Sequence, residues 1–248
     1  MMQRGRSRLQ PVFRAGLGGM SDGPRIAVVT FPGSNDDGDA ALALELLGAE
    51  AVRVWHAETA LPEGTTGVVL PGGFSYGDYL RCGAIARFAP VMEAVGTFAA
   101  SGGPVLGICN GFQILCEAGL LPGVLRPNRQ QQFICADVTV TVESTTSAFG
   151  GTWEVGQELV IPIKHGEGNW YGDDELVAAL EARGQVAFRY LDDVNGAVGR
   201  IAGVTNEAGN VLGLMPHPEH AVEELLGPTG GVAVLEGLLG AAGVPVVR

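Results

Sequence analysis

Residues 104–111, PVLGICNG, decide the fold that we predict for this chain of 248 residues. The run begins with apolar residues over the length of a short strand and ends with a cysteine close to two glycines. A continuous apolar run of this kind is typical of a strand buried on both faces of a parallel sheet. The glycines permit a sharp turn, and we expect a helix to begin directly after Cys109.

The residues before this turn repeat the alternation of strand and helix. Strands are expected at 25–31, 51–54 and 67–70, and helices at 40–47 and 90–100. Asn35 or Asp36 is placed to cap the first of these helices. Strands that alternate with helices predict an α/β fold with a doubly wound, mostly parallel sheet of the flavodoxin-like class. Ligands of such sheets bind at the carboxyl ends of the strands.

The second half of the chain predicts a few antiparallel strands within the same domain. Strands are expected at 133–142, 158–163, 185–190, 201–205 and 211–215, and helices at 173–182, 221–226 and 231–239. Asn195-Gly196 and Gly209-Asn210 are turn signals between strands. Because no repeat or linker interrupts the pattern, residues 21–248 are expected to form a single domain.

Residues 1–20 differ from the rest of the chain in composition. They contain four arginines and no acidic residue, and they lack the continuous apolar run of a secretory signal. One interpretation is an organelle transit peptide, which is also rich in arginine and poor in acids. The interpretation we favour is a disordered extension, or a start site at Met20 in place of Met1.

Charge and motifs exclude several classes of function. The chain has 15 Lys and Arg against 27 Asp and Glu, so its net charge of −12 would repel nucleic-acid phosphates. Its only lysine, Lys164, follows no P-loop glycine run, and no G-x-G-x-x-G follows the first predicted strand. No apolar run is long enough to span a membrane. The four cysteines match no zinc spacing. A chain of this length with so few, scattered cysteines does not need disulfides, which favours free thiols in a reducing cytoplasm.

Cys109 is the candidate nucleophile, because Gly107-Ile108-Cys109-Asn110-Gly111 has the form of a nucleophile elbow. The N–H groups at the start of the following helix would point at the sulfur, favour its thiolate and stabilise an oxyanion. The alternative is a buried, inert cysteine. We adopt that interpretation for Cys116 and Cys135 and favour it for Cys82.

His217 is the candidate base, with Glu219 to orient it. Both lie in Met215-Pro216-His217-Pro218-Glu219-His220, directly after a predicted strand. The prolines favour an extended backbone, in which residues two apart face the same way, so the two side chains can align. With Cys109 they form a Cys–His–Glu triad by role. A metal pair of His217 and His220 is a weaker alternative, because it lacks further ligands at suitable spacing, and we predict no metal.

Backbone amides at two strand ends are the candidate oxyanion hole. One belongs to Gly73 in Pro71-Gly72-Gly73-Phe74, which follows the predicted strand at 67–70, and the other to Asn110. On its own, the glycine pair would be interpreted as an ordinary turn.

Together these residues resemble the class I, triad-type glutamine amidotransferases. The resemblance covers residues 25–240 and rests on GICNGFQ at 107–113 and on His217-Pro218-Glu219. It implies that ammonia is released from glutamine through a cysteinyl thioester. Many members of this family have leucine after the cysteine, where this chain has Asn110.

Three further stretches resemble the glutaminase subunits of phosphoribosylformylglycinamidine synthase in purine biosynthesis. They are FPGSN at 31–35, GGFSYGDYLR at 72–81 and HGEG at 165–168. Because the chain is too short to hold the synthetase, the resemblance implies two partners, which are a small accessory protein and a separate synthetase subunit. The synthetase would use ATP and Mg to convert formylglycinamide ribonucleotide to the amidine, so no cofactor is expected in this chain.

Some polar residues in these stretches are candidate contacts to substrate or partner. They are Gln113, Arg81 and His165, and Asp78 and Arg81 are placed to meet the charged ends of glutamine. A solvated loop is the alternative for both the 74–81 and the 165–168 stretches. Two other functions remain open at this point: an amidotransferase with a different acceptor, and a binding or regulatory module with an inert triad.

Overall fold

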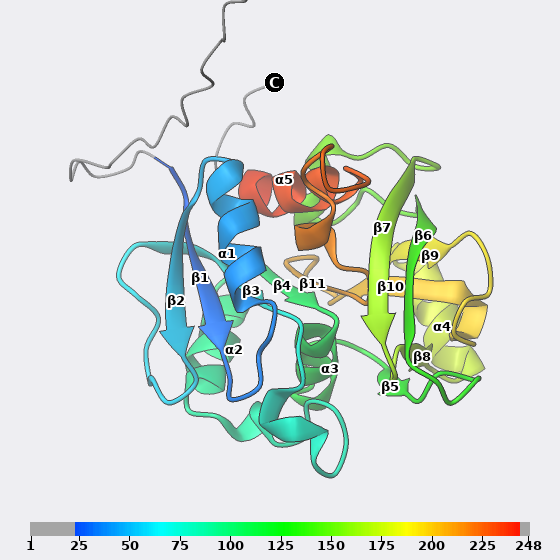
Figure 1. Cartoon of the computed structure of the whole chain (residues 1–248), viewed down its shortest axis with the longest axis horizontal. Coiled ribbons are helices and arrows are strands. Elements are labelled where there is room, and N and C mark those ends of the chain that lie inside the picture. The colour runs from blue at the N-terminus through cyan, green and yellow to red at the C-terminus, as the bar shows by residue number, and fades with distance from the viewer. Residues whose placement is uncertain (1–22, 244–248) are drawn as a thin grey trace, which may run out of the picture.

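The computed structural model describes residues 23–243, so the predicted extension over residues 1–20 lies outside the described residues. A nine-stranded sheet runs through the described chain in the order β2-β1-β3-β4-β11-β10-β9-β6-β7. Its first five strands are mutually parallel, and the last four pair antiparallel. Figure 1 shows these two halves side by side. The predicted fold class, mostly parallel with antiparallel strands in the second half, is confirmed.

The parallel half places the loops that matter for function. Its strands are β1 (Arg25–Thr30), β2 (Glu50–Trp55), β3 (Thr65–Leu70), β4 (Val105–Ile108) and β11 (Val211–Leu214). The helices that connect or cover them are α1 (Asp37–Leu46), α2 (Val91–Ala100), α3 (Asn110–Glu117) and α5 (Gly231–Ala241). Because β3, β4 and β11 are adjacent and parallel, the loops after them emerge at one edge of the sheet.

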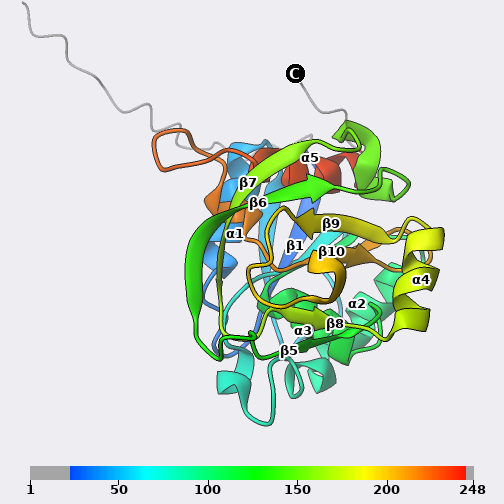
Figure 2. The ribbon, with the colours of Figure 1, turned by 90° about the vertical axis from the view of Figure 1, so that its right-hand side faces the viewer.

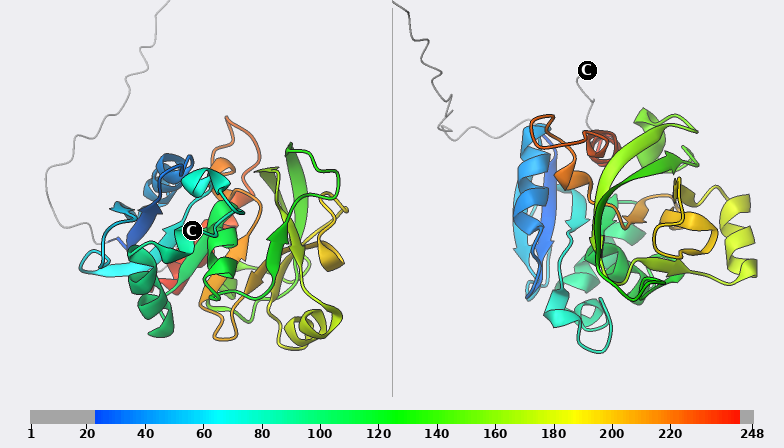
Figure 3. Two further views of the ribbon diagram at one scale, coloured as in Figure 1. Left: turned by 90° about the horizontal axis from the view of Figure 1, so that it is seen from below. Right: turned by 45° about the vertical axis from the view of Figure 1, so that its right-hand side comes forward.

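The antiparallel half consists of long strands and one helix. They are β6 (Ile134–Val142), β7 (Glu158–His165), β9 (Val186–Tyr190), β10 (Ile201–Thr205) and α4 (Asp174–Ala182). Figure 2 shows the β6–β7 ribbon curving along the molecule. The two views in Figure 3 show this half set against the helices of the parallel half. The free end of β7 thereby reaches the loops after β3, β4 and β11.

One sequence prediction about the elements is wrong, and one small sheet was not predicted. Residues 221–226 form turns and no helix: Leu225 and Leu226 are 97% and 81% exposed, and Ala221 is the only buried residue of the stretch, which is too little apolar surface to support a helix. A second sheet of β5 (Val124–Arg126) and β8 (Asn169–Tyr171) was not expected. Each of its strands has only three residues, which is too short for an alternating pattern to show.

Asp36 occupies the predicted cap position of α1 but does not cap it. The residue stands at the N-cap, yet its side chain makes no capping hydrogen bond to the helix. Its carboxylate points instead toward β7 and the loop after β11. None of the described helices combines the length and apolarity needed to cross a bilayer.

Candidate active site

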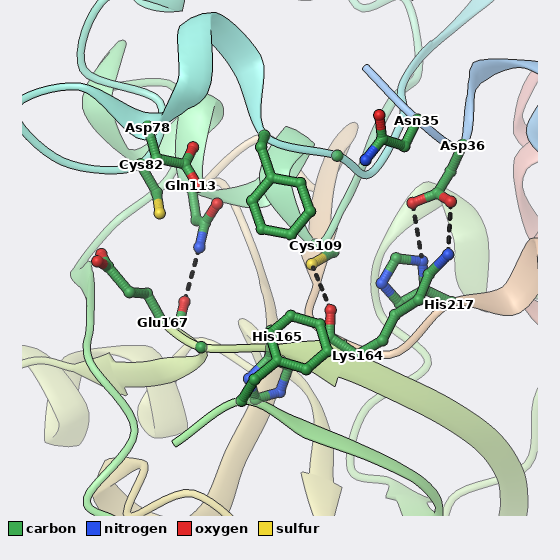
Figure 4. A pocket seen from close by; sticks show the side chains of 14 residues that line it. Asn35, Asp36, Asp78, Cys82, Cys109, Gln113, Lys164, His165, Glu167 and His217 are labelled. Atoms are coloured by element: carbon green, nitrogen blue, oxygen red, sulfur yellow. Dashed lines mark hydrogen bonds and ion pairs between the residues drawn. The ribbon is translucent and has the colours of Figure 1, made fainter. Parts of the chain in front are cut away.

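A cavity of about 280 Å³ lies at the carboxyl edge of the sheet, where the loops after β3, β4 and β11 meet the end of β7. Figure 4 shows the side chains that line it, with the Cys109 sulfur near the middle. One end of the cavity holds Asp36 and His217, and the other holds Asp78 and Glu167. Residues from both halves of the sheet therefore form one site.

Cys109 adopts the strained conformation predicted for a nucleophile elbow. Its backbone angles are φ 49° and ψ −103°, and it is the N-cap of α3. Its N–H donates to the Leu214 carbonyl of β11 at 2.8 Å, which fixes the turn to the neighbouring strand. A side chain at Gly111 would place its Cβ 1.9 Å from the Leu70 carbonyl oxygen. The second glycine of the motif thus lets α3 pack directly on β3.

His217 and Glu219 form the close pair that the sequence predicted. The Nδ1 atom of His217 lies 2.6 Å from Oε1 of Glu219, and both side chains are buried. Burial lowers the pKa of His217, but the charges of Glu219 and Cys109 outweigh it and raise that pKa above its ordinary value. Nε2 of His217 has no hydrogen-bond partner among the described residues. One ring nitrogen of His217 is thus held by Glu219, and the other is left for the cavity that Cys109 also lines, which is the arrangement a triad requires.

The backbone that aligns this pair differs from the prediction. Residues Pro218–His220 form a 3₁₀ turn and no extended segment. The turn brings Glu219 back under the imidazole, and the His217 N–H donates to the Pro162 carbonyl of β7 at 2.8 Å. The predicted pairing is therefore correct, but a tight turn and a tie to β7 produce it.

The Gly73 amide is left available at the edge of the cavity. Gly73 pairs with Ser34 in an antiparallel bridge, whose two hydrogen bonds run from Phe74 N to Gly33 O and from Asn35 N to Gly72 O and do not use the Gly73 N–H. Gly73 has φ 144°, and a Cβ there would lie 2.6 Å from the Asn35 nitrogen, so only glycine fits.

Asn110 contributes its amide from the first position of α3. Its buried side chain accepts from the Ser75 N–H at 3.1 Å and donates to Oε1 of Gln113 at 2.9 Å. The residue therefore ties the loop after β3 to the elbow. The oxyanion role of the two amides remains a prediction.

The other predicted contacts divide between the cavity and the surface. Gln113 lines the cavity and donates to the Glu167 carbonyl at 2.7 Å. His165 also lines it, and burial together with the charge of His217 lowers the pKa of His165 to about 4. Arg81 does not line it: its exposed guanidinium pairs with Glu117 at 2.5 Å and 2.6 Å. Arg81 thus lies outside the set of residues that line the cavity, and its contact to substrate or partner remains a prediction.

The cysteines other than Cys109 have different surroundings. Cys135 is exposed, so its interpretation as a buried thiol is wrong, because its position in β6 faces solvent. Cys116 is partly buried, and burial raises the pKa of its thiol. Cys82 lines the cavity, where burial and the nearby Asp78 raise its pKa and keep the thiol protonated.

Sequence reasoning missed Asp36, Lys164 and Glu167 as site residues. Lys164 Nζ lies 2.5 Å from Oδ1 of Asp36 and 2.9 Å from Nε2 of His220. Asp36 was expected only to cap a helix, and Lys164 was noted only for the missing P-loop. Glu167 belongs to the 165–168 stretch, which was expected either to contact substrate or partner or to be a solvated loop, but Glu167 itself was given no role. That Lys164 is the only lysine in the chain was the one available signal.

Four donor groups lie together as they would around a metal ion. Those of Asp36, His217, Glu219 and His220 lie within 4.8 Å of one another. The Lys164 ammonium already contacts both Asp36 and His220 and supplies positive charge there. We therefore treat the four residues as a cluster neutralised by lysine and assign them no metal.

Residues 23–230 match the family of CobB/CobQ-like glutamine amidotransferase domains. The chain is also 54% identical over 224 residues to the phosphoribosylformylglycinamidine synthase subunit PurQ of Bradyrhizobium diazoefficiens, covering 86% of this chain and 96% of that protein. Identity to the PurQ of Lacticaseibacillus paracasei is 57% over 216 residues, covering 87% and 94%. The chain therefore belongs to the PurQ family of glutamine amidotransferases, and the family resemblance predicted from the motifs is confirmed.

Solved structures agree with this assignment. The structure of PurLQS from Thermotoga maritima matches with a TM-score of 0.81 and 46% identity, covering 88% of this chain and 98% of that one. Another glutamine amidotransferase from Thermotoga maritima matches with a TM-score of 0.54 at 18% identity, covering 88% and 96%, which shows a common fold alone.

Proposed function

We propose that this chain is the glutaminase subunit of phosphoribosylformylglycinamidine synthase and that Cys109, His217 and Glu219 perform the hydrolysis. The observation that carries the proposal is the buried His217–Glu219 pair beside a strained cysteine at the mouth of a helix. The PurQ relatives support the same assignment. An inert triad would not need a strained elbow and a buried, charged pair.

The reaction begins when the Cys109 thiolate attacks the carboxamide carbon of glutamine. The oxyanion that forms accepts hydrogen bonds from the amides of Gly73 and Asn110. His217 gives its proton to the amide nitrogen, the C–N bond breaks, and ammonia leaves a glutamyl thioester on Cys109. Neutral His217 then takes a proton from water, whose oxygen attacks the thioester. The C–S bond breaks, which releases glutamate and restores the thiolate–imidazolium pair.

The charges in the cavity orient glutamine. Asp78 and Glu167 lie at the end far from His217 and offer carboxylates to the α-ammonium group. The rings of Phe74 and Phe133, 6.4 Å apart, give apolar contact to the methylene chain. This pose places the carboxamide at Cys109, in the middle of the cavity.

The ammonia would pass to a synthetase partner. The Thermotoga maritima neighbour is part of PurLQS, which supports a complex of this chain with a PurL-type synthetase and a small PurS-type subunit. In that complex PurL would use ATP and Mg to convert formylglycinamide ribonucleotide to formylglycinamidine ribonucleotide. This chain itself would need no cofactor, and its place in biosynthesis favours the cytoplasm.

Replacing Cys109 by alanine tests the assignment. In the assembled complex, Cys109→Ala should abolish synthesis that depends on glutamine, while free ammonium still supports it, because only the ammonia source is lost. Cys109→Ser should behave similarly. Normal glutamine turnover by the alanine variant would show that the nucleophile is elsewhere.

A further inference from the structure

A second carboxylate besides Glu219 lies against the His217 imidazole, and an ammonium group is bonded to that carboxylate. Oδ2 of Asp36 lies 3.7 Å from Nδ1 of His217, and Oδ1 of the same carboxylate bonds the Lys164 ammonium at 2.5 Å. Figure 4 shows Asp36 and Lys164 joined next to His217. Both residues line the cavity, yet the hydrolysis described above gives neither of them a role.

The local backbone is built to let Asp36 reach His217. The amides of Asn35 and Asp36 both donate to the Gly72 carbonyl, at 3.2 Å and 3.3 Å, which fixes the approach of the loop. A Cβ on Gly72 would lie 2.4 Å from Oδ2 of Asp36 and 2.6 Å from Cε1 of His217. Glycine at 72 is thus what allows the contact, and Asp36 leaves its helix uncapped to make it.

Lys164 lies against both Asp36 and Cys109. Its ammonium neutralises Asp36, and its main-chain carbonyl lies 3.9 Å from the Cys109 sulfur. Burial raises the pKa of Asp36, but hydrogen bonds from His220 and Lys164 outweigh it and hold that pKa below its ordinary value. The carboxylate is therefore ionised throughout the working range of pH.

Several charged and titratable groups surround His217. The charged and titratable groups facing it or its neighbours are Glu219, Asp36, Lys164, His220, His165, Cys109 and, against His220, Asp39. His165 is neutral at pH 7, since its pKa is about 4. If Asp36 were present without Lys164, the two carboxylates of Asp36 and Glu219 would hold the proton on the imidazole. If Lys164 were present without Asp36, its positive charge would repel the imidazolium.

We propose that Asp36 and Lys164 form a charge-compensated positioning pair that acts through His217. Asp36 supports the imidazolium, and Lys164 cancels the surplus negative charge, so the proton stays transferable to the leaving ammonia. Neither residue contacts the reacting atoms through its side chain. The inference rests on the proposed function, because it assigns the pair to the proton transfer of glutamine hydrolysis.

The test follows the rate at which iodoacetamide alkylates Cys109 in the full chain as pH is varied, read by mass spectrometry of the Cys109 peptide. Exposed Cys135 serves as the internal reference. The wild-type profile should have two steps, which belong to the coupled Cys109–His217 pair. Asp36→Asn leaves Lys164 uncompensated and should move both steps to lower pH by about one unit. Lys164→Met leaves Asp36 uncompensated and should move both to higher pH.

The double variant Asp36→Asn/Lys164→Met should return toward the wild-type profile. Asp37→Asn is the matched control, because that neighbouring carboxylate faces Thr30 and Arg53 instead of the cavity, and it should shift neither step. Both single variants break the same ion pair, so a merely structural role predicts equal effects. Shifts of the same sign, or none, overturn the proposal. If Asp36→Asn does not fold, Lys164→Met alone tests the proposal: an upward shift of both steps supports it, and any other result overturns it.

Failure of this inference and failure of the proposed function give different results. Alkylation of Cys109 requires no glutamine, so it measures the effect of Asp36 and Lys164 on Cys109 and His217 whether or not the chain is a glutaminase. An assembled wild-type complex that does not hydrolyse glutamine would overturn the function. A complex that does so, with unchanged alkylation profiles in the charge variants, would overturn only the role of Asp36 and Lys164.

Discussion

Cys109 can be identified from the sequence, but the residues that surround it in the folded chain cannot. The glycines at 107 and 111 allow the close packing on either side of a positive-φ cysteine between a strand and a helix, and they are visible in the sequence. The Asp36–Lys164 contact joins residues 128 positions apart and leaves no local pattern. Residues that serve a turn are therefore predictable, whereas residues that serve a distant partner are found only in the folded chain.

The acidic end of the cavity leads to a prediction about substrate selection. Asp78 and Glu167 line the cavity opposite His217. Burial raises the pKa of Asp78, and the nearby Glu167 adds to that rise, so the two carboxylates repel each other until a cation binds between them. Asp78→Asn and Glu167→Gln should each raise KM for glutamine about tenfold, with kcat nearly unchanged.

Steady-state kinetics with glutamine and with its analogue lacking the α-amino group check this prediction. The wild-type enzyme should prefer glutamine strongly, and the variants should lose most of that preference. Asp193→Asn, which breaks an exposed pair with Arg129, is the control for a general change of charge. An unchanged ratio between the two substrates would place the α-ammonium elsewhere.

At the scale of elements, the strands and helices of the parallel half follow closely from the sequence. The predicted strand at 67–70 is β3, and the helix expected after Cys109 is α3. These elements succeed because burial on both faces gives continuous apolar runs. The failures are short or loop-like elements: residues 221–226 have helical composition but bury only Ala221, and β8 has three residues.

Asn110 provides the prediction at this scale, because it connects two elements. Asn110→Leu would leave the Ser75 N–H and Oε1 of Gln113 without their partner, in a buried position. Each orphaned group costs about 1–3 kcal/mol. We expect faster hydrogen exchange over residues 74–81 and a kcat/KM for glutamine reduced about tenfold or more.

Asn110→Asp separates the two bonds of that connection. The aspartate keeps an acceptor for the Ser75 N–H but loses the donor to Gln113, so the 74–81 loop should stay protected while activity falls. Hydrogen exchange measured by mass spectrometry distinguishes the variants. If leucine at 110 leaves exchange over 74–81 unchanged, the loop is held by other contacts.

At the scale of the whole molecule, the site forms only where both halves of the sheet meet. Cys109 and Gly73 belong to the parallel half, while Lys164 and His165 come from β7 at the antiparallel edge. The His217 N–H bond to Pro162 joins the halves directly. The sequence predicted both halves, but not how the long β6–β7 ribbon bends to bring its end to the cavity, because sheet curvature depends on the packing of the entire domain.

The exposed apolar loop beside the cavity gives the last prediction, which concerns assembly. Tyr79 and Leu80 are 74% and 91% exposed, and Phe88, further along the chain, is 75% exposed. Asp78 and Cys82 lie on either side of Tyr79 and Leu80 in the chain, and both line the cavity, so a partner docked here would cover the mouth of the cavity and receive the ammonia.

Leu80→Asp should weaken binding to the synthetase partners about tenfold or more, because it buries a charge in the interface. Val155→Asp is the matched control: it is 67% exposed, near the end of β7 remote from His165. Surface plasmon resonance measures the affinity, and alkylation of Cys109 confirms that both variants keep the site intact. Equal weakening by the two substitutions, or none by Leu80→Asp, would mean that the synthetase approaches the molecule from another side.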